Sequence, residues 1–287
     1  MSANVIDQFQ RHLRDQDLSA RTVIEYGRDV LRFATWLDAQ GEPFALDVIT
    51  TPTITRYRAA LQQRELSPAA INRQLVTLKR LCAWAQEFGL ASTDAARPVK
   101  LIPAVKSSPR ELSDREESAL VAAVTKFGTA RDKAMLILML HTGLRAMEVC
   151  NLKIADISIN IRSGSLQVRG GKRNKFRSVP LNITARTALS EYLSPSKPAD
   201  WLFPSERGGR LGERALRYIV EKYARIARIE DVSPHDLRHR FGYRMAEKTP
   251  LHRLAQLMGH DSLNTTLIYV GATEKDLQAE VDKIAWE

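Results

Sequence analysis

Apolar residues recur at helical spacing along the first hundred residues of the chain. Residues 4–16 form one short amphipathic segment, and a second covers residues 20–40. Ser19 stands before the second segment as an N-cap residue would, and the apolar positions that follow lie three or four residues apart: Tyr26, Val30, Phe33 and Leu37. A third segment covers residues 53–65, and Ser67 opens a fourth. This pattern predicts a helical first domain.

Prolines and serines interrupt the helical pattern over residues 97–113. We therefore expect an N-terminal helical domain over residues 1–101, a linker over 102–110 and a second domain over 111–287. Beyond the linker, apolar periodicity predicts helices near residues 113–126, 129–142, 183–193, 212–228, 235–247 and 250–259.

One stretch of the second domain, residues 165–181, has the character of strands. Two short β-leaning runs flank a glycine-rich basic turn, which predicts a β-hairpin. The expected fold class is therefore mainly α with a small β-sheet, in two domains.

The net charge of the chain bears on the kind of partner that it binds. The 287 residues carry a formal net charge of +10, which indicates a polyanionic partner, most simply nucleic acid, although solubility alone would also explain it. Cys82 and Cys150 form neither a disulfide framework nor a CxxC metal pattern. The apolar run 134–140 is too short to span a bilayer, and the first residues lack the apolar core of a signal peptide. We expect a soluble protein of the cytoplasm.

Basic residues follow shared faces of the second and fourth helical segments. They are Arg21, Arg28 and Arg32 in one, and Arg73 and Arg80 in the other. A solvated helix face would explain one such helix. Two of them in a basic chain favour contacts with the phosphate backbone of DNA.

Four short stretches beyond the linker carry candidate chemistry. The first is HTGLRAMEVCNL, residues 141–152, in which Gly143 is a candidate helix C-cap. Arg145 and Glu148 follow three residues apart, so they share a helix face, and the glutamate can fix the orientation of the guanidinium. A surface ion pair is the alternative.

The second stretch is the hairpin turn, RGGKRNKFR, residues 169–177. Lys172 follows two glycines, but a P-loop needs glycine where Leu166 stands and serine or threonine where Arg173 stands, so nucleotide hydrolysis has no support. A lysine on such a turn can enter a DNA groove or donate a proton, and a solvated basic turn is the alternative. Arg173 and Lys175 are candidate DNA contacts.

The third stretch is SPHDLRHRFGYRMAE, residues 233–247, which begins as a capped helix. His235 and Arg238 share one face of it. His235 and His239 have the i,i+4 spacing of a zinc helix. However, Arg238 between them would oppose a dication, and no third ligand is apparent.

The fourth stretch is LMGHDSLNTTLIYV, residues 257–270. A helix is expected to end at Gly259, with His260 directly after it and Tyr269 nine residues later. Tyr269 is either a half-buried aromatic residue or a nucleophile.

The order and spacing of these groups closely resemble the tyrosine recombinase (phage integrase) family. TGLRAMEVCNL resembles its first box, HDLRHRF its second and LMGHDSLNTTLIY its third. The resemblance covers residues 110–287 or so, while the N-terminal helices resemble the SAM-like core-binding domain. The size is most similar to Xer-type and transposon-encoded members. Two positions depart from the pattern: Gly271, where many relatives have histidine, and Arg240, where threonine or a similar residue is common.

The resemblance implies a site-specific DNA recombinase or integrase. Tyr269 would attack a DNA phosphodiester, form a 3′-phosphotyrosyl bond and release a 5′-hydroxyl, and a partner strand's hydroxyl would reverse the step. A free tyrosine has a pKa of about 10, so His235 is the candidate base. Arg145 and Arg238 would present planar forks to the non-bridging oxygens, and His260 would add a hydrogen bond.

Two further roles follow from the same resemblance. Lys172 is the candidate acid for the departing 5′-oxygen, and Glu148 would orient rather than react. Fixed positive charge takes the place of a metal ion, and the phosphotyrosyl bond stores the energy of the broken linkage. The implied reaction therefore needs no metal, ATP or other cofactor.

The resemblance also implies an assembly. The two domains would form a C-shaped clamp on double-stranded DNA that carries a specific recombination site, and a homo-tetramer, or one with a paralogous partner, would join two such sites. The tail, about residues 274–287, has an apolar stripe of Leu277, Val281 and Ile284. It predicts a helix that docks on a neighbouring protomer or on its own domain.

Three other functions remain open from the sequence. One is a non-catalytic DNA-binding protein on the same fold. Another is a relaxing enzyme of the type IB topoisomerase kind, with the same phosphotyrosyl chemistry. A third is a zinc hydrolase built on His235 and His239.

Overall fold

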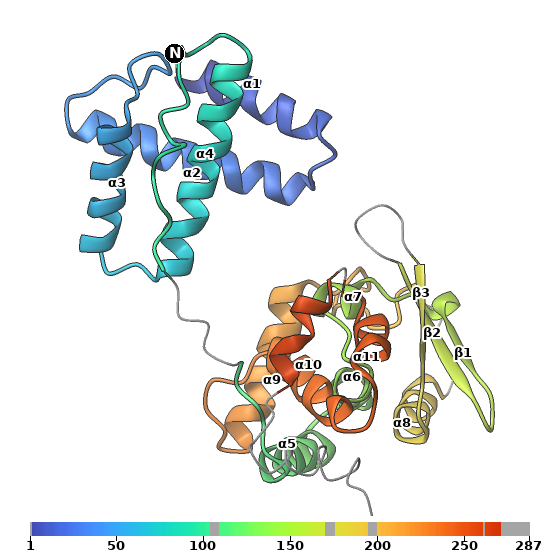
Figure 1. Ribbon diagram of the computed structural model, residues 1–287. Coiled ribbons are helices and arrows are strands. Elements are labelled where there is room, and N and C mark those ends of the chain that lie inside the picture. Colours follow the sequence, from blue (N-terminus) through green and yellow to red (C-terminus); the bar gives the residue numbers. More distant parts are fainter. Residues whose placement is uncertain (1, 104–108, 170–175, 195–199, 261, 271–287) are drawn as a thin grey trace, which may run out of the picture. The chain divides into compact units, whose positions relative to one another are not determined.

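The computed structural model describes residues 2–103, 109–169, 176–194, 200–260 and 262–270. The chain divides into two compact units, Met1–Lys106 and Ser107–Glu287, and each has its own hydrophobic core. Helices dominate both units, and a small sheet belongs to the second (Figure 1). The predicted fold class is confirmed. In the described ranges, no helix combines the length and the apolar character needed to cross a membrane.

The first unit consists, over its described residues, of α1 (Ser2–Asp15), α2 (Ala20–Ala39), α3 (Thr51–Gln63) and α4 (Pro68–Glu87). Ser19, Thr50 and Ser67 cap the last three helices, because each side-chain oxygen accepts a hydrogen bond from a backbone N–H of the first turn. Aromatic rings fill much of the core: the Phe33 and Tyr57 ring centroids lie 4.9 Å apart.

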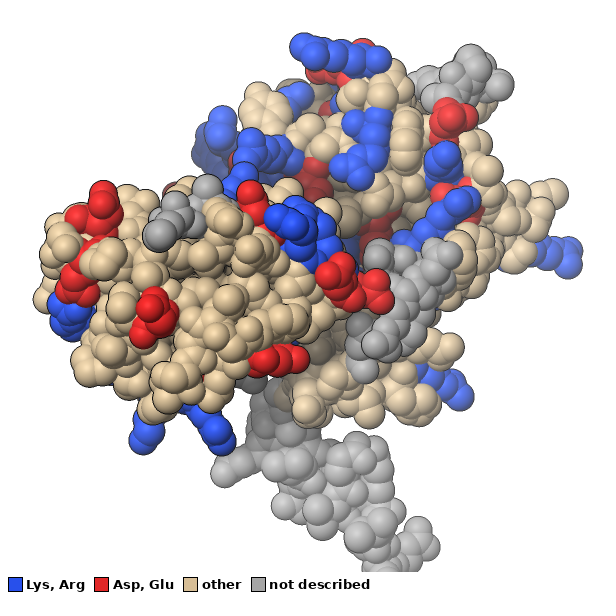
Figure 2. Space-filling model, turned by 90° about the horizontal axis from the view of Figure 1, so that it is seen from above, with Lys and Arg blue, Asp and Glu red and all other residues tan. Residues whose placement is uncertain are grey.

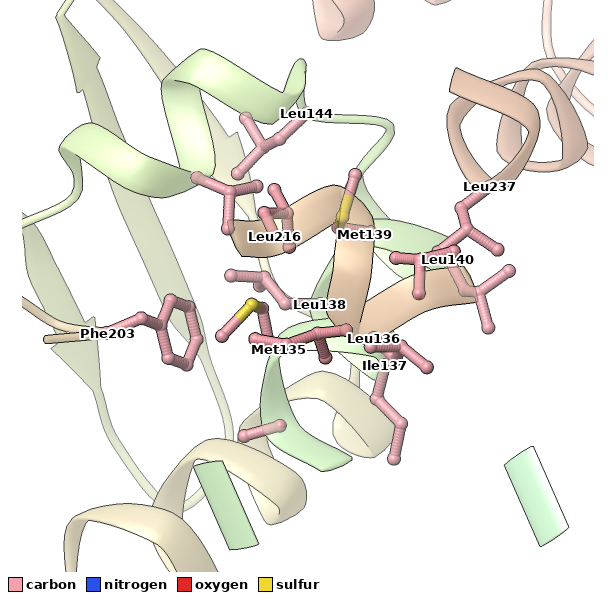
Figure 3. Close-up of a cluster of buried hydrophobic side chains, with 14 of the residues drawn as sticks. Met135, Leu136, Ile137, Leu138, Met139, Leu140, Leu144, Phe203, Leu216 and Leu237 are labelled. Atoms are coloured by element: carbon pink, nitrogen blue, oxygen red, sulfur yellow. The ribbon is translucent and has the colours of Figure 1, made fainter. Parts of the chain in front are cut away.

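The second unit contains α5 (Asp114–Phe127), α6 (Ala130–Thr142), α7 (Ala146–Asn151), α8 (Ile183–Leu193), α9 (Glu213–Ile226), α10 (Pro234–Ala246) and α11 (Leu251–Met258). The ends of the predicted helices lie within two residues of these bounds. Helix α6 is its centre, because residues 134–140 are all buried. Their side chains belong to one buried cluster with Leu144, Phe203, Leu216 and Leu237, which Figure 3 shows around α6.

The sheet is antiparallel, in the order β1-β2-β3. The predicted hairpin supplies β2 (Gly164–Arg169) and β3 (Phe176–Pro180), with Val168 opposite Arg177. A three-residue strand, β1 (Ile157–Ile159), adds an edge that the sequence did not predict. The sheet brings Arg177 on β3 toward α7 and α11.

Two glycines end helices where the sequence predicted it. Gly143 ends α6 with φ of 62° and Gly259 ends α11 with φ of 64°, conformations that glycine adopts without strain. A Cβ atom on Gly143 would lie 2.3 Å from the Phe241 ring. Arg145 therefore follows the first of these turns by two residues, and His260 follows the second directly.

Candidate active site

Arg145 stands at the N-cap of α7, two residues after Gly143, the C-cap of α6. Its backbone N–H donates to Glu148 Oε2 at 2.8 Å, and its guanidinium donates to Glu148 Oε1 at 3.0 Å and to the carbonyl of Gly259 at 2.8 Å. The side chain is still 45% exposed. One edge of the fork is therefore fixed, and the rest remains open to a ligand.

Arg177 is a second partner of Glu148. It binds both carboxylate oxygens, Nη1 to Oε1 at 2.7 Å and Nη2 to Oε2 at 2.8 Å, and its Nε donates to the carbonyl of Leu257. Burial would raise the pKa of Glu148, but the hydrogen bonds and charge of Arg177, with the backbone of Arg145, keep that pKa below its ordinary value. The ionised Glu148 thus orients two guanidinium groups at once.

Arg238 extends from α10 into the space between the two glycine turns and is buried. Nη1 donates to the carbonyl of Gly143, while Nη2 donates to the carbonyl of Met258 at 2.9 Å and lies 2.8 Å from Nε2 of His260. Burial, and then the charge of Arg145, lowers the pKa of Arg238 to about 10. The group remains a cation at neutral pH. Among the described residues, no carboxylate forms an ion pair with it.

His260 is neutral, and its contacts fix its tautomer. Guanidinium nitrogens only donate, so Nε2 of His260 accepts from Arg238. Nδ1 therefore carries the proton and donates to Oγ1 of the buried Thr266 at 2.7 Å. Burial, followed by the charges of Arg238 and Arg145, lowers the pKa of His260 to about 4. In this arrangement His260 orients Arg238.

Tyr269 ends a short 3-10 turn, η3 (Leu267–Tyr269), and is only 5% exposed. Its ring lies against α10 where Gly242 leaves room: a Cβ atom at Gly242 would come within 2.5 Å of the ring. Its hydroxyl lies 3.0 Å from Nδ1 of His239, and the ring of Tyr243 packs edge-on at 5.2 Å. Burial raises the pKa of Tyr269, against the charge of Arg238.

His235 occupies the first turn of α10, and its ring centroid lies 4.2 Å from that of His239. The hydroxyl of Tyr269 is thus bonded to His239 and not to His235. Partial burial, and then the charge of Arg238, lowers the pKa of His235. His235 is accordingly neutral at physiological pH. Among the described residues, no three His, Cys, Asp or Glu side chains are grouped as metal ligands.

The hairpin turn with Lys172, Arg173 and Lys175 lies outside the described residues. The strands on either side are described, and Arg177, the second residue of the return strand, follows Lys172 by five residues. The candidate acid is therefore connected by a short length of chain to a residue that binds Glu148.

The charges near Glu148 do not balance. Three guanidinium groups, those of Arg145, Arg177 and Arg238, lie around one carboxylate, and Arg145 and Arg177 are the two that bind it. The guanidinium of Arg238 has only carbonyls and a neutral imidazole as partners. Such a cluster is suited to an anion with several oxygens, as a phosphodiester has.

Arg240, also buried on α10, has the opposite surroundings. It binds three carboxylates of α5 and the segment before it, those of Glu111, Asp114 and Glu117. Burial alone would lower the pKa of Arg240, but the hydrogen bond and charge of Glu117 raise it. Arg240 cross-links α10 to α5, which explains why an arginine is stable at this unusual position.

The candidate DNA contacts of the first unit are partly committed to ion pairs. Arg32 of α2 and Arg73 of α4 bind the same carboxylate, Asp29, whose side chain is fully buried. Both arginine side chains remain about half exposed, at 51% and 43%. Asp29 thus places two guanidinium groups from different helices side by side.

The other three candidates of this unit are separate. Arg28 pairs with Glu25 on the surface, and Arg80 lies over the ring of Tyr26. Arg21 is exposed at the start of α2. In the view of Figure 2, basic side chains stand in several groups, with acidic side chains beside some of them.

Sequence reasoning missed four residues that shape this site: Arg177, His239, Gly242 and Thr266. Arg177 belongs to the basic run of the hairpin, which offered no sign that it pairs with Glu148. The spacing of His239 from His235 indicates a zinc ligand and gives no sign of a contact with Tyr269. Gly242 acts through close packing and Thr266 through its hydrogen bond with His260, and one sequence has no local signal for either contact.

The sequence matches known protein families over most of its length. Residues 110–276 match the model of the phage integrase family, and residues 6–88 match that of the phage integrase N-terminal SAM-like domain. Tyrosine recombinase XerD of Ralstonia nicotianae is 34% identical over 292 residues, which cover 96% of this chain and 92% of the relative.

Solved structures share the fold. XerH recombinase bound to its difH substrate superposes with a TM-score of 0.75 at 21% identity, covering 99% of this chain and 84% of that one. A lambda integrase tetramer bound to a Holliday junction gives 0.75 at 17% identity, covering 94% of this chain and 77% of that one.

Proposed function

This chain belongs to the phage integrase family, the tyrosine recombinases, and on that premise we propose that Tyr269 is the nucleophile with which it cleaves DNA. The protein is a site-specific DNA recombinase, an enzyme that breaks and rejoins DNA strands. The proposal assigns roles to its residues. The surroundings of Arg238 are the main support for the proposal. A buried cation held by carbonyls and a neutral imidazole is a site prepared for an anion.

In the proposed step, Oη of Tyr269 forms a bond to phosphorus while the bond from phosphorus to the 5′-oxygen breaks. The phenol proton passes to His235, whose lowered pKa keeps it neutral and able to accept. Lys172 protonates the 5′-oxygen. Because Tyr269 is buried, the segment that carries it moves before attack. A 5′-hydroxyl from the partner strand then reverses the step.

Charge stabilisation falls to Arg145 and Arg238. Their free guanidinium N–H groups bind the non-bridging oxygens, which gain charge in the transition state. Glu148 and Arg177 fix Arg145, and His260 fixes Arg238. Because these groups already stand in place, little reorganisation is needed when the phosphate arrives.

The partner is double-stranded DNA with a specific recombination site. In the first unit, the pair Arg32 and Arg73 on Asp29 offers a prearranged contact for backbone phosphates. Arg21, Arg28 and Arg80 add weaker contacts, as do Arg173 and Lys175 of the hairpin. A non-catalytic DNA-binding protein or a relaxing topoisomerase-like enzyme would be the alternative on this fold.

We place the reaction in the cytoplasm, on a homo-tetramer that joins two sites and carries out integration, excision or resolution. The tail helix, about residues 274–287, lies outside the described residues, and docking on a neighbouring protomer is its proposed use. Removal of this tail should abolish synapsis of two sites and leave binding of one site intact. Gel shifts that show normal tetramers for the truncated protein would contradict the proposed docking.

The decisive experiment uses a suicide DNA substrate nicked near the cleavage point. Wild type should trap a covalent adduct, and Y269F should bind the same DNA but trap none. Y218F is a matched control, because Tyr218 is 65% exposed on α9 and has no proposed role. An adduct formed by Y269F would overturn the proposal.

A further inference from the structure

The hydroxyl of Tyr269 has a specific partner in the resting protein. It lies 3.0 Å from Nδ1 of His239, and the two rings lie 5.6 Å apart, centroid to centroid. Both residues are at most 5% exposed. A buried hydroxyl with no partner is costly, so this contact favours the position in which Tyr269 is found.

Two further contacts define the same position. Gly242, one turn of α10 beyond Arg238, leaves the space that the ring fills, and Tyr243 closes it from the side. Helix α10 therefore carries both a guanidinium for the phosphate and a seat for the nucleophile.

His239 is a poor base in this place. Burial, and then His235, lowers the pKa of His239 to about 4, whereas burial raises the pKa of Tyr269. Proton transfer from the phenol to His239 would therefore be strongly uphill. The contact is therefore a hydrogen bond between two neutral groups, with the phenol as donor and Nδ1 as acceptor.

We propose that His239 is a positioning residue that holds the hydroxyl of Tyr269 in a resting seat on α10 until DNA binding draws the nucleophile out. This inference rests on the proposed role of Tyr269. An interaction present before attack and absent during it stabilises only the starting state, so it slows cleavage. Its use is restraint, because it keeps the nucleophile away from phosphates until a complete complex has formed.

Two substitutions separate the hydrogen bond from the bulk of the side chain. In H239N the amide occupies the place of Nδ1 and can still accept from the phenol, whereas in H239Q it lies one atom further out, at the place of Nε2. H252Q, at an exposed histidine of α11, is the control for a histidine-to-amide change.

The first measurement needs neither DNA nor catalysis. Each protein is nitrated with tetranitromethane, and the tryptic peptide 254–275, whose single tyrosine is Tyr269, is quantified by mass spectrometry. Nitration should be at least about threefold higher in H239Q than in H239N, wild type and H252Q. The exposed Tyr218 should react equally in all four. Equal nitration of Tyr269 in H239Q and H239N would overturn the proposal.

The second measurement is the single-turnover rate of adduct formation on saturating suicide DNA. H239Q should form the adduct roughly fivefold faster than H239N, which is the scale of one hydrogen bond. A merely structural role would give a slower H239Q, and that result would also overturn the proposal. Failure of wild type to trap an adduct would instead contradict the role of Tyr269, while the nitration result would stand.

Discussion

Arg238 and Arg240 lie two residues apart on α10 and are both buried, yet their surroundings are opposite. Arg238 is bound by two backbone carbonyls and a neutral histidine. Arg240 is bound by three carboxylates. The pKa of Arg238 is lowered and that of Arg240 is raised.

The two arginines differ in whether their positive charge is already neutralised by neighbouring groups. Carbonyl dipoles satisfy hydrogen bonds but leave the charge of Arg238 uncompensated, so an arriving anion completes its surroundings. The carboxylates around Arg240 already do so. The uncompensated charge of Arg238 therefore suits the proposed binding of phosphate, while the ion pairs of Arg240 stabilise the unit.

The sharpest way to break this comparison is R238K. Lysine keeps the charge but cannot donate in the planar fork that Gly143, Met258 and His260 hold in place. Adduct formation at saturating DNA should fall about 10²–10³-fold, with DNA affinity changed little. R244K, on the same helix but paired with Glu117, is the control. A rate for R238K within tenfold of wild type would contradict the role of Arg238.

R240M should act on stability instead. It leaves Glu117, a 13% exposed carboxylate, with only Arg244 as its partner, and should cost about 3 kcal/mol of unfolding free energy in the second unit. Urea unfolding, followed by hydrogen exchange of α5 and α10 peptides, measures this. The double substitution R240M with E117Q should recover part of the loss. Full stability of R240M alone would show that the carboxylates do not matter.

Acid should affect the Arg238 face first. The folded pKa values of His239 and His260 are about 4, below the ordinary value near 6.5. The unfolded chain therefore binds more protons between these values, so stability is complete above pH 6.5 and is lost as pH falls toward 4. Each histidine contributes a slope of up to about 1.4 kcal/mol per pH unit. In urea titrations at pH 7, 6 and 5, H260N should show a shallower loss than wild type.

The smallest effects belong to the first unit. R32M or R73M removes one of two guanidinium groups on Asp29 and should weaken DNA binding several-fold, while lowering the slope of log affinity against log salt by up to about 0.9. R28M, whose arginine pairs with Glu25 on the surface, should change either quantity less. Equal effects of all three substitutions would mean that Asp29 prearranges nothing.

Much of the fold was predictable because its signals are local. Ser19 and Ser67 cap helices, Gly143 and Gly259 end them, and apolar spacing marks the buried faces. Strand β1 was not predicted, because three residues carry too little periodicity and its pairing with β2 is a tertiary matter.

The site divides along the same line. The pair of Arg145 and Glu148 was predictable from its i,i+3 spacing, and the ion pair between the two residues is present. The bond from Tyr269 to His239 joins residues thirty positions apart, and neighbouring helix positions gave no reason to prefer His239 over His235. The pairing of Arg32 and Arg73 was equally hidden, because the burial of Asp29 depends on how α2 packs on α4.

The two strands of the hairpin limit how far Lys172, the proposed proton donor, can lie from the rest of the site. Arg169, three residues before Lys172, forms an ion pair with Asp156, and Arg177, five residues after it, forms one with Glu148. A stretched chain gains at most about 3.5 Å per residue. The α-carbon of Lys172 can therefore lie no further than about 10 Å from that of Arg169 and about 17 Å from that of Arg177. Lengthening the turn would widen both limits. The length of the turn would then affect how often the proposed acid protonates the departing 5′-oxygen.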